Sequence, residues 1–142
     1  MNSHTMQRAV VASLLSITAA AWAQTSAGLG RADYMDNCAS CHGISAKGDG
    51  PVGSFLVKPP ADLTQIAHRY GGPFPQALLK EVIDGRWSGD RGPHGSRDMP
   101  VWGQVFKERA MTQAGDSSTT AEWSASQRVA SLVMYLKTLQ QP

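Results

Sequence analysis

Cys38, Cys41 and His42 lie within the stretch DNCASCHG, residues 36–43, and these are the only two cysteines of the chain. Thiols and imidazoles bind metals, form disulfides or attach a cofactor covalently. Four kinds of site use such a pattern: a disulfide, a thioredoxin-like redox pair, a structural zinc site, and the C-x-x-C-H attachment site of a c-type haem.

The first three kinds of site fit the rest of the sequence less well than the fourth. A disulfide across so short a loop stabilises a fold only weakly. A redox pair expects a βαβ setting, and a zinc site needs a fourth ligand and usually a second cysteine pair. In a haem site Cys38 and Cys41 form thioethers with the vinyl groups, and the imidazole of His42 lies beneath the iron. A haem-free thiol module remains the alternative.

The first 23 residues have the form of a secretory signal peptide. Arg8 lies in a short polar start, an apolar run covers residues 9–21, and Ala21-Trp22-Ala23 is an A-x-A cleavage site. The run is shorter than the roughly 20 residues of a spanning helix, so an uncleaved anchor is the less favoured alternative. We expect a signal peptide over residues 1–23 and an exported, soluble periplasmic domain over residues 24–142, without a later membrane span.

The composition fits one small globular domain that does not bind nucleic acid. The chain has 142 residues, of which 13 are basic and 11 acidic, and it has no long run of lysine or arginine. Nucleic-acid binding therefore lacks electrostatic support. The 14 glycines and 8 prolines indicate long loops and a thin core.

Helices are the elements that must position the cysteine motif. The sequence predicts a helix over residues 31–41, which carries both cysteines, and an extended loop over residues 43–60. Asp62 is expected to cap a short helix that runs toward His68. No strand pattern is present anywhere, so the predicted fold class is all-α.

Two helices are predicted in the middle of the chain. The first begins near Pro75 and ends at Gly85. Its apolar residues recur with helical spacing: Leu78, Leu79, Val82 and Ile83. A short helix is expected from Pro100 to about Ala110.

The last helix has the clearest pattern. Thr119 and Glu122 have the spacing of a capping box, which predicts the start of the helix. Its apolar residues repeat at i, i+3, i+4 and i+7: Val129, Leu132, Val133 and Leu136.

Four stretches of the sequence resemble the class I c-type cytochromes, in particular the small bacterial monohaem ones. YMDNCASCHG and GDGP are similar to the family's haem segment, DMPVWG to its distal-ligand segment, and LVMYLKTLQ to its closing helix. The resemblance covers nearly all of residues 28–142. It implies the cytochrome c fold, in which helices and glycine-rich loops surround one haem c bound covalently through two cysteines. It also implies that the last helix crosses the first near Tyr34.

The resemblance implies a methionine opposite His42 on the iron, and Met99 is the expected ligand. Met99 follows a glycine-rich loop that can place its sulfur over the distal face. The other methionines lie in the signal peptide, on the cysteine-bearing helix, before a polar loop or within the last helix: Met1, Met6, Met35, Met111 and Met134. His68 and His94 are rival ligands for which we expect surface positions.

The resemblance also suggests the residues around the ligands. His42 is expected to donate its second ring N–H to the carbonyl of Pro59 or Pro60. Arg86 and Trp87 are expected either to be haem-propionate partners or to be exposed loop residues. Trp102 is expected to pack against the haem edge or in the core, and the sequence does not decide between the two.

An iron held by His42 and Met99 has no position left for a substrate, and such a centre moves single electrons. We therefore expect an electron carrier rather than an enzyme, either a free shuttle or a subunit of a dehydrogenase or oxidase complex. Its cofactor-binding residues would be Cys38, Cys41, His42 and Met99, and its metal ligands His42 and Met99. Its partners would be redox proteins such as a dehydrogenase, an oxidase or another cytochrome. The alternative is a cytochrome subunit with an open or labile distal site, similar to a peroxidase or gas sensor.

Overall fold

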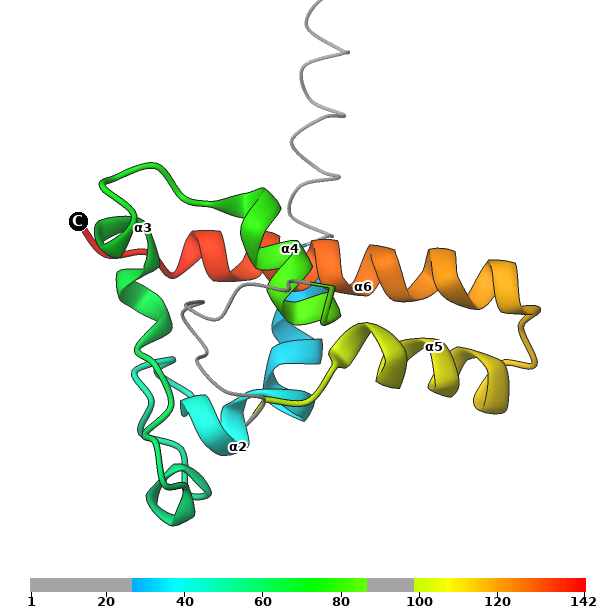
Figure 1. The fold of residues 1–142 in the computed structure, drawn as a ribbon, viewed down its shortest axis with the longest axis horizontal. Helices are drawn as coiled ribbons and strands as arrows, with labels where there is room; N and C mark the ends of the chain where they lie inside the picture. The colour runs from blue at the N-terminus through cyan, green and yellow to red at the C-terminus, as the bar shows by residue number, and fades with distance from the viewer. Residues whose placement is uncertain (1–26, 87–98) are drawn as a thin grey trace, which may run out of the picture.

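The computed structural model describes residues 27–86 and 99–142, and in these residues it contains helices, turns and loops but no strand (Figure 1). Residues 27–37 form a helix, called here the N-terminal helix. The elements that follow are α2 (Ala39–His42), η1 (Gly53–Phe55), η2 (Leu63–Gln65), α3 (Ile66–Arg69), α4 (Gln76–Asp84), α5 (Trp102–Gln113) and α6 (Ser118–Thr138). The all-α fold class is confirmed.

The cysteine motif lies where the first helix is interrupted rather than inside one continuous helix. The N-terminal helix ends at residue 37, Cys38 is in a turn, and α2 carries Cys41 and His42. Gly43 ends α2 with a φ of 80°, a conformation that side chains with a Cβ rarely adopt. The predicted single helix over residues 31–41 therefore consists of two helices.

Residues 62–85 follow the predicted order of short helices. The Asp62 carboxylate accepts a hydrogen bond from the Thr64 amide and caps η2, which continues into α3. Leu79 and Ile83 of α4 are buried in the core. The helix ends at Gly85, whose φ of 86° is left-handed, as the sequence indicated.

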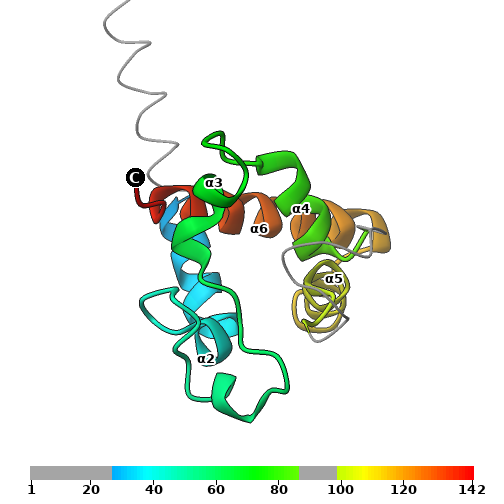
Figure 2. The ribbon, with the colours of Figure 1, turned by 60° about the vertical axis from the view of Figure 1, so that its left-hand side comes forward.

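Helices α5 and α6 form an antiparallel pair that extends to one side of the molecule (Figures 1 and 2). Phe106 of α5 is fully buried. The cap of α6 is Ser117, whose hydroxyl accepts from the Thr120 amide, so the predicted capping box at Thr119 and Glu122 is wrong. The carboxylate of Glu122 instead forms an ion pair with Lys107, 2.9 Å away on α5.

The N-terminal helix crosses α6, as the resemblance implied. A Cβ added at Gly30 would lie 1.9 Å from the carbonyl oxygen of Ser131, so only glycine permits this approach. One turn further on, the rings of Tyr34 and Tyr135 are 5.4 Å apart between centroids. The predicted apolar stripe of α6 is buried: Val129, Leu132, Val133 and Leu136.

The end of the chain is fastened to α3 and η2 by hydrogen bonds. The amide group of Gln140 donates to the Leu63 carbonyl at 2.9 Å and accepts from the Ala67 amide at 2.8 Å. The backbone amide of Gln141 donates to Thr64. These contacts hold α3 and the residues before it against the C-terminal end of α6, where the cavity described below lies.

Candidate haem site

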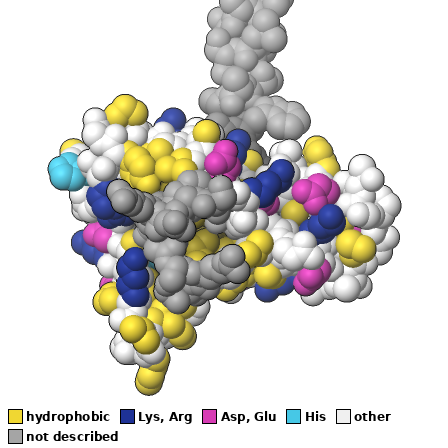
Figure 3. Space-filling model, viewed as in Figure 1, with side chains coloured by type: hydrophobic (Ala, Val, Ile, Leu, Met, Phe, Trp, Pro, Cys, Tyr) yellow, Lys and Arg dark blue, Asp and Glu magenta, His cyan; other side chains and the backbone are white. Residues whose placement is uncertain are grey.

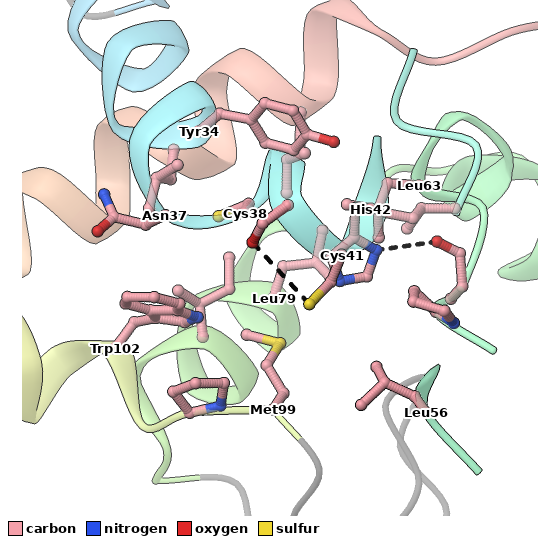
Figure 4. Close-up of a pocket in the computed structure, with 18 of the residues that line it drawn as sticks. Tyr34, Asn37, Cys38, Cys41, His42, Leu56, Leu63, Leu79, Met99 and Trp102 are labelled. Carbon is pink, nitrogen blue, oxygen red and sulfur yellow. Dashed lines mark hydrogen bonds between the residues drawn. The ribbon is translucent and has the colours of Figure 1, made fainter. Parts of the chain in front are cut away.

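A cavity of about 230 Å³ lies between the N-terminal helix, α2, α4, α6 and the segment that leads into α5 (Figure 4). Its wall is mostly apolar. The apolar lining includes Leu56, Leu63, Ile66, Leu79, Ile83, Leu132 and Leu136. Polar groups of the lining include Asn37, Ser40 and Lys58, and the cysteine motif and Met99 complete it.

Both cysteines line this cavity with free thiols. Burial, together with the nearby charge of Asp33, raises the pKa of the Cys38 thiol to about 12. A reactive thiol of a redox pair has a lowered pKa, so this environment does not favour thioredoxin-like chemistry. Cys38 and Cys41 instead place two free thiols at one wall of an apolar cavity (Figure 4).

The imidazole of His42 is buried at the same wall. Its Nδ1 lies 3.0 Å from the carbonyl oxygen of Ala61, and burial lowers its pKa below the ordinary 6.5. A neutral ring that donates through Nδ1–H has its lone pair on Nε2. The contact with Ala61 therefore selects the tautomer that metal-binding histidines use.

The expectation that Pro59 or Pro60 provides this carbonyl is wrong. Pro60 directs its carbonyl toward Gly48, where an added Cβ would lie 2.3 Å from the oxygen. Successive carbonyls of an extended chain point in different directions, so the group that reaches His42 belongs to the next residue, Ala61. The sequence predicted the segment correctly and the residue one position early.

Met99 lines the cavity from the segment that precedes α5, whereas His42 comes from α2 (Figure 4). The side chain of Met99 is half-buried and packs against the core. Met111 is exposed, and the sulfur of Met134 lies 3.9 Å from the side-chain amide nitrogen of Gln76. Among the methionines of the described residues, Met99 is the one that lines the cavity.

The other residues singled out from the sequence have different positions. His68 is exposed on α3 and does not line the cavity. Arg86 is exposed and contacts Asp84 and Glu122 rather than the cavity. Trp102 lines the cavity and packs on Phe106 at 5.8 Å between ring centroids, so the packing in the core is observed and the packing against a haem edge stays a prediction. His94 and Trp87 lie outside the described residues.

Two polar residues of the site were not identified from the sequence. Asn37 is buried beside the cavity and accepts a hydrogen bond from Arg109 of α5 at 2.7 Å. Tyr34 lines the cavity and donates to the carbonyl of Gly43 at 2.6 Å. Both lie on the N-terminal helix before Cys38, and their spacing from it, one and four residues, was the available signal.

The family model for cytochrome c matches residues 27–140. The chain belongs to the cytochrome c family. No curated protein and no solved structure matches it. Membership implies haem-based electron transfer with redox partners. No helix among the described residues of this cytochrome is long and apolar enough to cross a membrane.

The donor groups of the cavity fit a haem of the c type. Two thiols are available for thioether bonds, one imidazole has a fixed tautomer, and one thioether comes from another segment. The apolar wall suits a porphyrin, whose surface is largely apolar. In contrast, residues 27–86 and 99–142 contain no group of three or more His, Cys, Asp or Glu side chains that could hold a metal ion.

Apolar side chains are exposed next to the cavity. Phe55 and Val57 flank the cavity-lining Leu56, and their exposed fractions are 86% and 107%. Figure 3 shows hydrophobic side chains gathered at the lower end of the molecule, where the segment containing η1 lies. This cytochrome therefore has a protruding apolar surface beside its candidate haem site.

Proposed function

We propose that the chain is a periplasmic electron carrier with one covalently bound haem c. Cys38 and Cys41 would form the thioether bonds, and His42 and Met99 would be the ligands of the iron. The observation that carries this proposal is the arrangement of these four side chains around one apolar cavity (Figure 4). When bound, the haem supplies a one-electron Fe(III)/Fe(II) couple.

The residues of the chain set the properties of that couple. The Ala61 carbonyl holds the His42 ring in one orientation and increases its basicity as a ligand. A thioether ligand from Met99 favours the reduced iron more than a second imidazole does, which raises the reduction potential. The apolar wall keeps water away, so little solvent reorganises when the charge changes.

The proposal includes export and the subfamily. We infer that residues 1–23 are a cleaved signal peptide, that residues 24–142 are the mature domain, and that this is a class I bacterial monohaem cytochrome. These inferences rest on the sequence motifs and on the leader pattern. We propose redox proteins as partners. Encounters of this kind use small interfaces, for which the surface around Phe55 and Val57 is suited.

The test is the covalent attachment of haem. The chain is expressed with a c-type haem maturation system, and the mature protein is expected to carry the mass of one haem that acidified organic solvent does not extract. Cys38→Ala and Cys41→Ala each leave one thioether, and the double variant loses its haem to the solvent. Ser54→Ala, at an exposed residue outside the cavity lining, is the control and retains the haem. A colourless mature protein, or a haem extractable from the unmodified protein, contradicts the proposal.

A further inference from the structure

An arginine on α6 joins the two sides of the candidate haem site. The Nε of Arg128 lies 3.1 Å from both carboxylate oxygens of Asp33, and Nη2 also contacts Oδ1. The face of the same guanidinium lies 4.1 Å above the centroid of Phe106 on α5. Arg128 therefore contacts the N-terminal helix through its edge and α5 through its face.

Phe106 packs in turn on Trp102, which lies close to Met99 in the sequence. Phe106 and Trp102 are four residues apart on α5, and their rings lie 5.8 Å apart at an angle of 31°. Trp102 lines the cavity, and Met99 comes three residues before it. The position of α5 thus determines where the Met99 segment meets the cavity.

On the other side of Arg128, Asp33 belongs to the helix that leads into the cysteine motif. Asp33 is 9% exposed, and its backbone carbonyl accepts a hydrogen bond from the Asn37 amide at 2.8 Å. Asn37 precedes Cys38 and also accepts from Arg109 of α5. Two arginines on two helices therefore reach the same face of the N-terminal helix.

We propose that Arg128 is a positioning residue that holds the Met99 segment at the cavity, by clamping Asp33 on the N-terminal helix to Phe106 on α5. This inference rests on the proposed function, in which Met99 is an iron ligand. Arg128 itself is not among the residues that line the cavity. A planar, bidentate guanidinium makes both contacts at once, which the point charge of a lysine does not do.

The clamp is tested by how readily an external ligand replaces Met99. Imidazole is titrated into the ferric holoprotein, and its apparent affinity is followed by the loss of the weak absorption band of the ferric thioether–iron bond. Arg128→Leu and Arg128→Lys are both expected to increase this affinity by about tenfold, the equivalent of about 1.4 kcal/mol. Phe106→Leu keeps the ion pair between Arg128 and Asp33 but removes the ring under the guanidinium. This variant is also expected to have an increased imidazole affinity.

Val129→Ala is the matched control, because Val129 is buried on the next position of α6 but does not line the cavity. It should lower the global unfolding midpoint without a matching change in imidazole affinity. If affinity follows the unfolding midpoint equally in all variants, Arg128 acts only on stability and the inference is wrong. If Arg128→Leu does not fold, the test uses Phe106→Leu, and its imidazole affinity is compared with its unfolding midpoint in the same way.

A Met99→Ala variant separates this inference from the proposed function. If it keeps the thioether–iron band, Met99 is not a ligand and the proposed function fails together with the inference. If it loses the band while the Arg128 and Phe106 variants bind imidazole like the unmodified protein, only the inference fails.

Discussion

Gly30 of the N-terminal helix rests directly on the backbone of α6, so that an added Cβ would lie 1.9 Å from the Ser131 carbonyl oxygen. No flexible side chain can move aside there, because the obstructing atom belongs to the backbone of a long helix. The crossing brings Tyr34 against Tyr135 and Asp33 against Arg128. Asn37 at the end of this helix and Cys38 in the turn after it then line the cavity.

A Gly30→Ala substitution should therefore destabilise the protein by about 2–3 kcal/mol, the cost of overpacking a close contact. Gly28→Ala is the matched control, since nothing lies within 4 Å of an added Cβ there. It should be neutral or stabilise the helix by up to about 1 kcal/mol. Chemical denaturation of both variants measures the difference. Equal effects would show that the helix crossing is looser than described.

Met99→Ala is expected to lower the reduction potential by on the order of 100 mV, within the ~0.8 V range that axial ligands span in haem proteins. The thioether ligand favours the reduced iron, and its loss removes that preference. Redox titration of the purified holoprotein measures the change. Met111→Ala, at an exposed methionine on α5, is the control and should leave the potential unchanged. An unchanged potential in Met99→Ala would rule out the proposed ligand.

Tyr34→Phe should reduce stability at neutral pH by about 1–2 kcal/mol, because the buried Gly43 carbonyl loses its hydrogen-bond donor. The two proteins should also differ at alkaline pH. Burial raises the pKa of Tyr34 well above its ordinary 10.0. The unfolded chain releases this proton near pH 10 and the folded chain retains it, so stability falls above pH 10 by up to about 1.4 kcal/mol per pH unit.

Tyr34→Phe lacks the pH dependence that the raised pKa of Tyr34 causes, so the stability of this variant should decline less steeply above pH 10. Lysines and the other tyrosines titrate in the same range, and the difference between the two proteins removes their effect. Denaturation midpoints measured from pH 8 upward for both proteins provide the comparison. Parallel curves would mean that Tyr34 is accessible to solvent in the folded protein.

Ser117→Ala should cost about 1 kcal/mol of stability, since the hydroxyl of Ser117 caps α6 through the Thr120 amide. Thr119→Ala should stay within about 0.5 kcal/mol, as expected for an exposed residue without such a contact. Thermal unfolding of the two variants distinguishes them. A larger loss of stability in Thr119→Ala than in Ser117→Ala would support the capping box that the sequence suggested.

The sequence predicted those features that depend on local pattern. The apolar stripes of α4 and α6 were identified because burial requires helical spacing, and Gly85 was identified because a left-handed helix end requires glycine. The sequence placed the cap of α6 at Thr119, two residues after the observed cap, Ser117. Ser117, Thr119 and Thr120 all have hydroxyls, and the choice among them depends on where the turn from α5 ends.

The cysteine motif and Met99 were predicted from spacing and family resemblance, whereas the rest of the cavity depends on tertiary packing. The carbonyl that reaches His42 belongs to Ala61 because the loop turns its neighbour, Pro60, toward Gly48. The arginine contacts to Asp33 and Asn37 join residues 95 and 72 positions apart. No local pattern contains such pairings.

The cavity wall needs Leu132 and Leu136, which belong to the last helix of the chain. During synthesis the segment with Cys38 and Cys41 leaves the ribosome long before these leucines have been added. Until α6 has packed, the cavity that the two cysteines line lacks part of its wall. For the exported cytochrome proposed above, the interval before α6 packs is the one in which an attachment enzyme would reach both sulfurs.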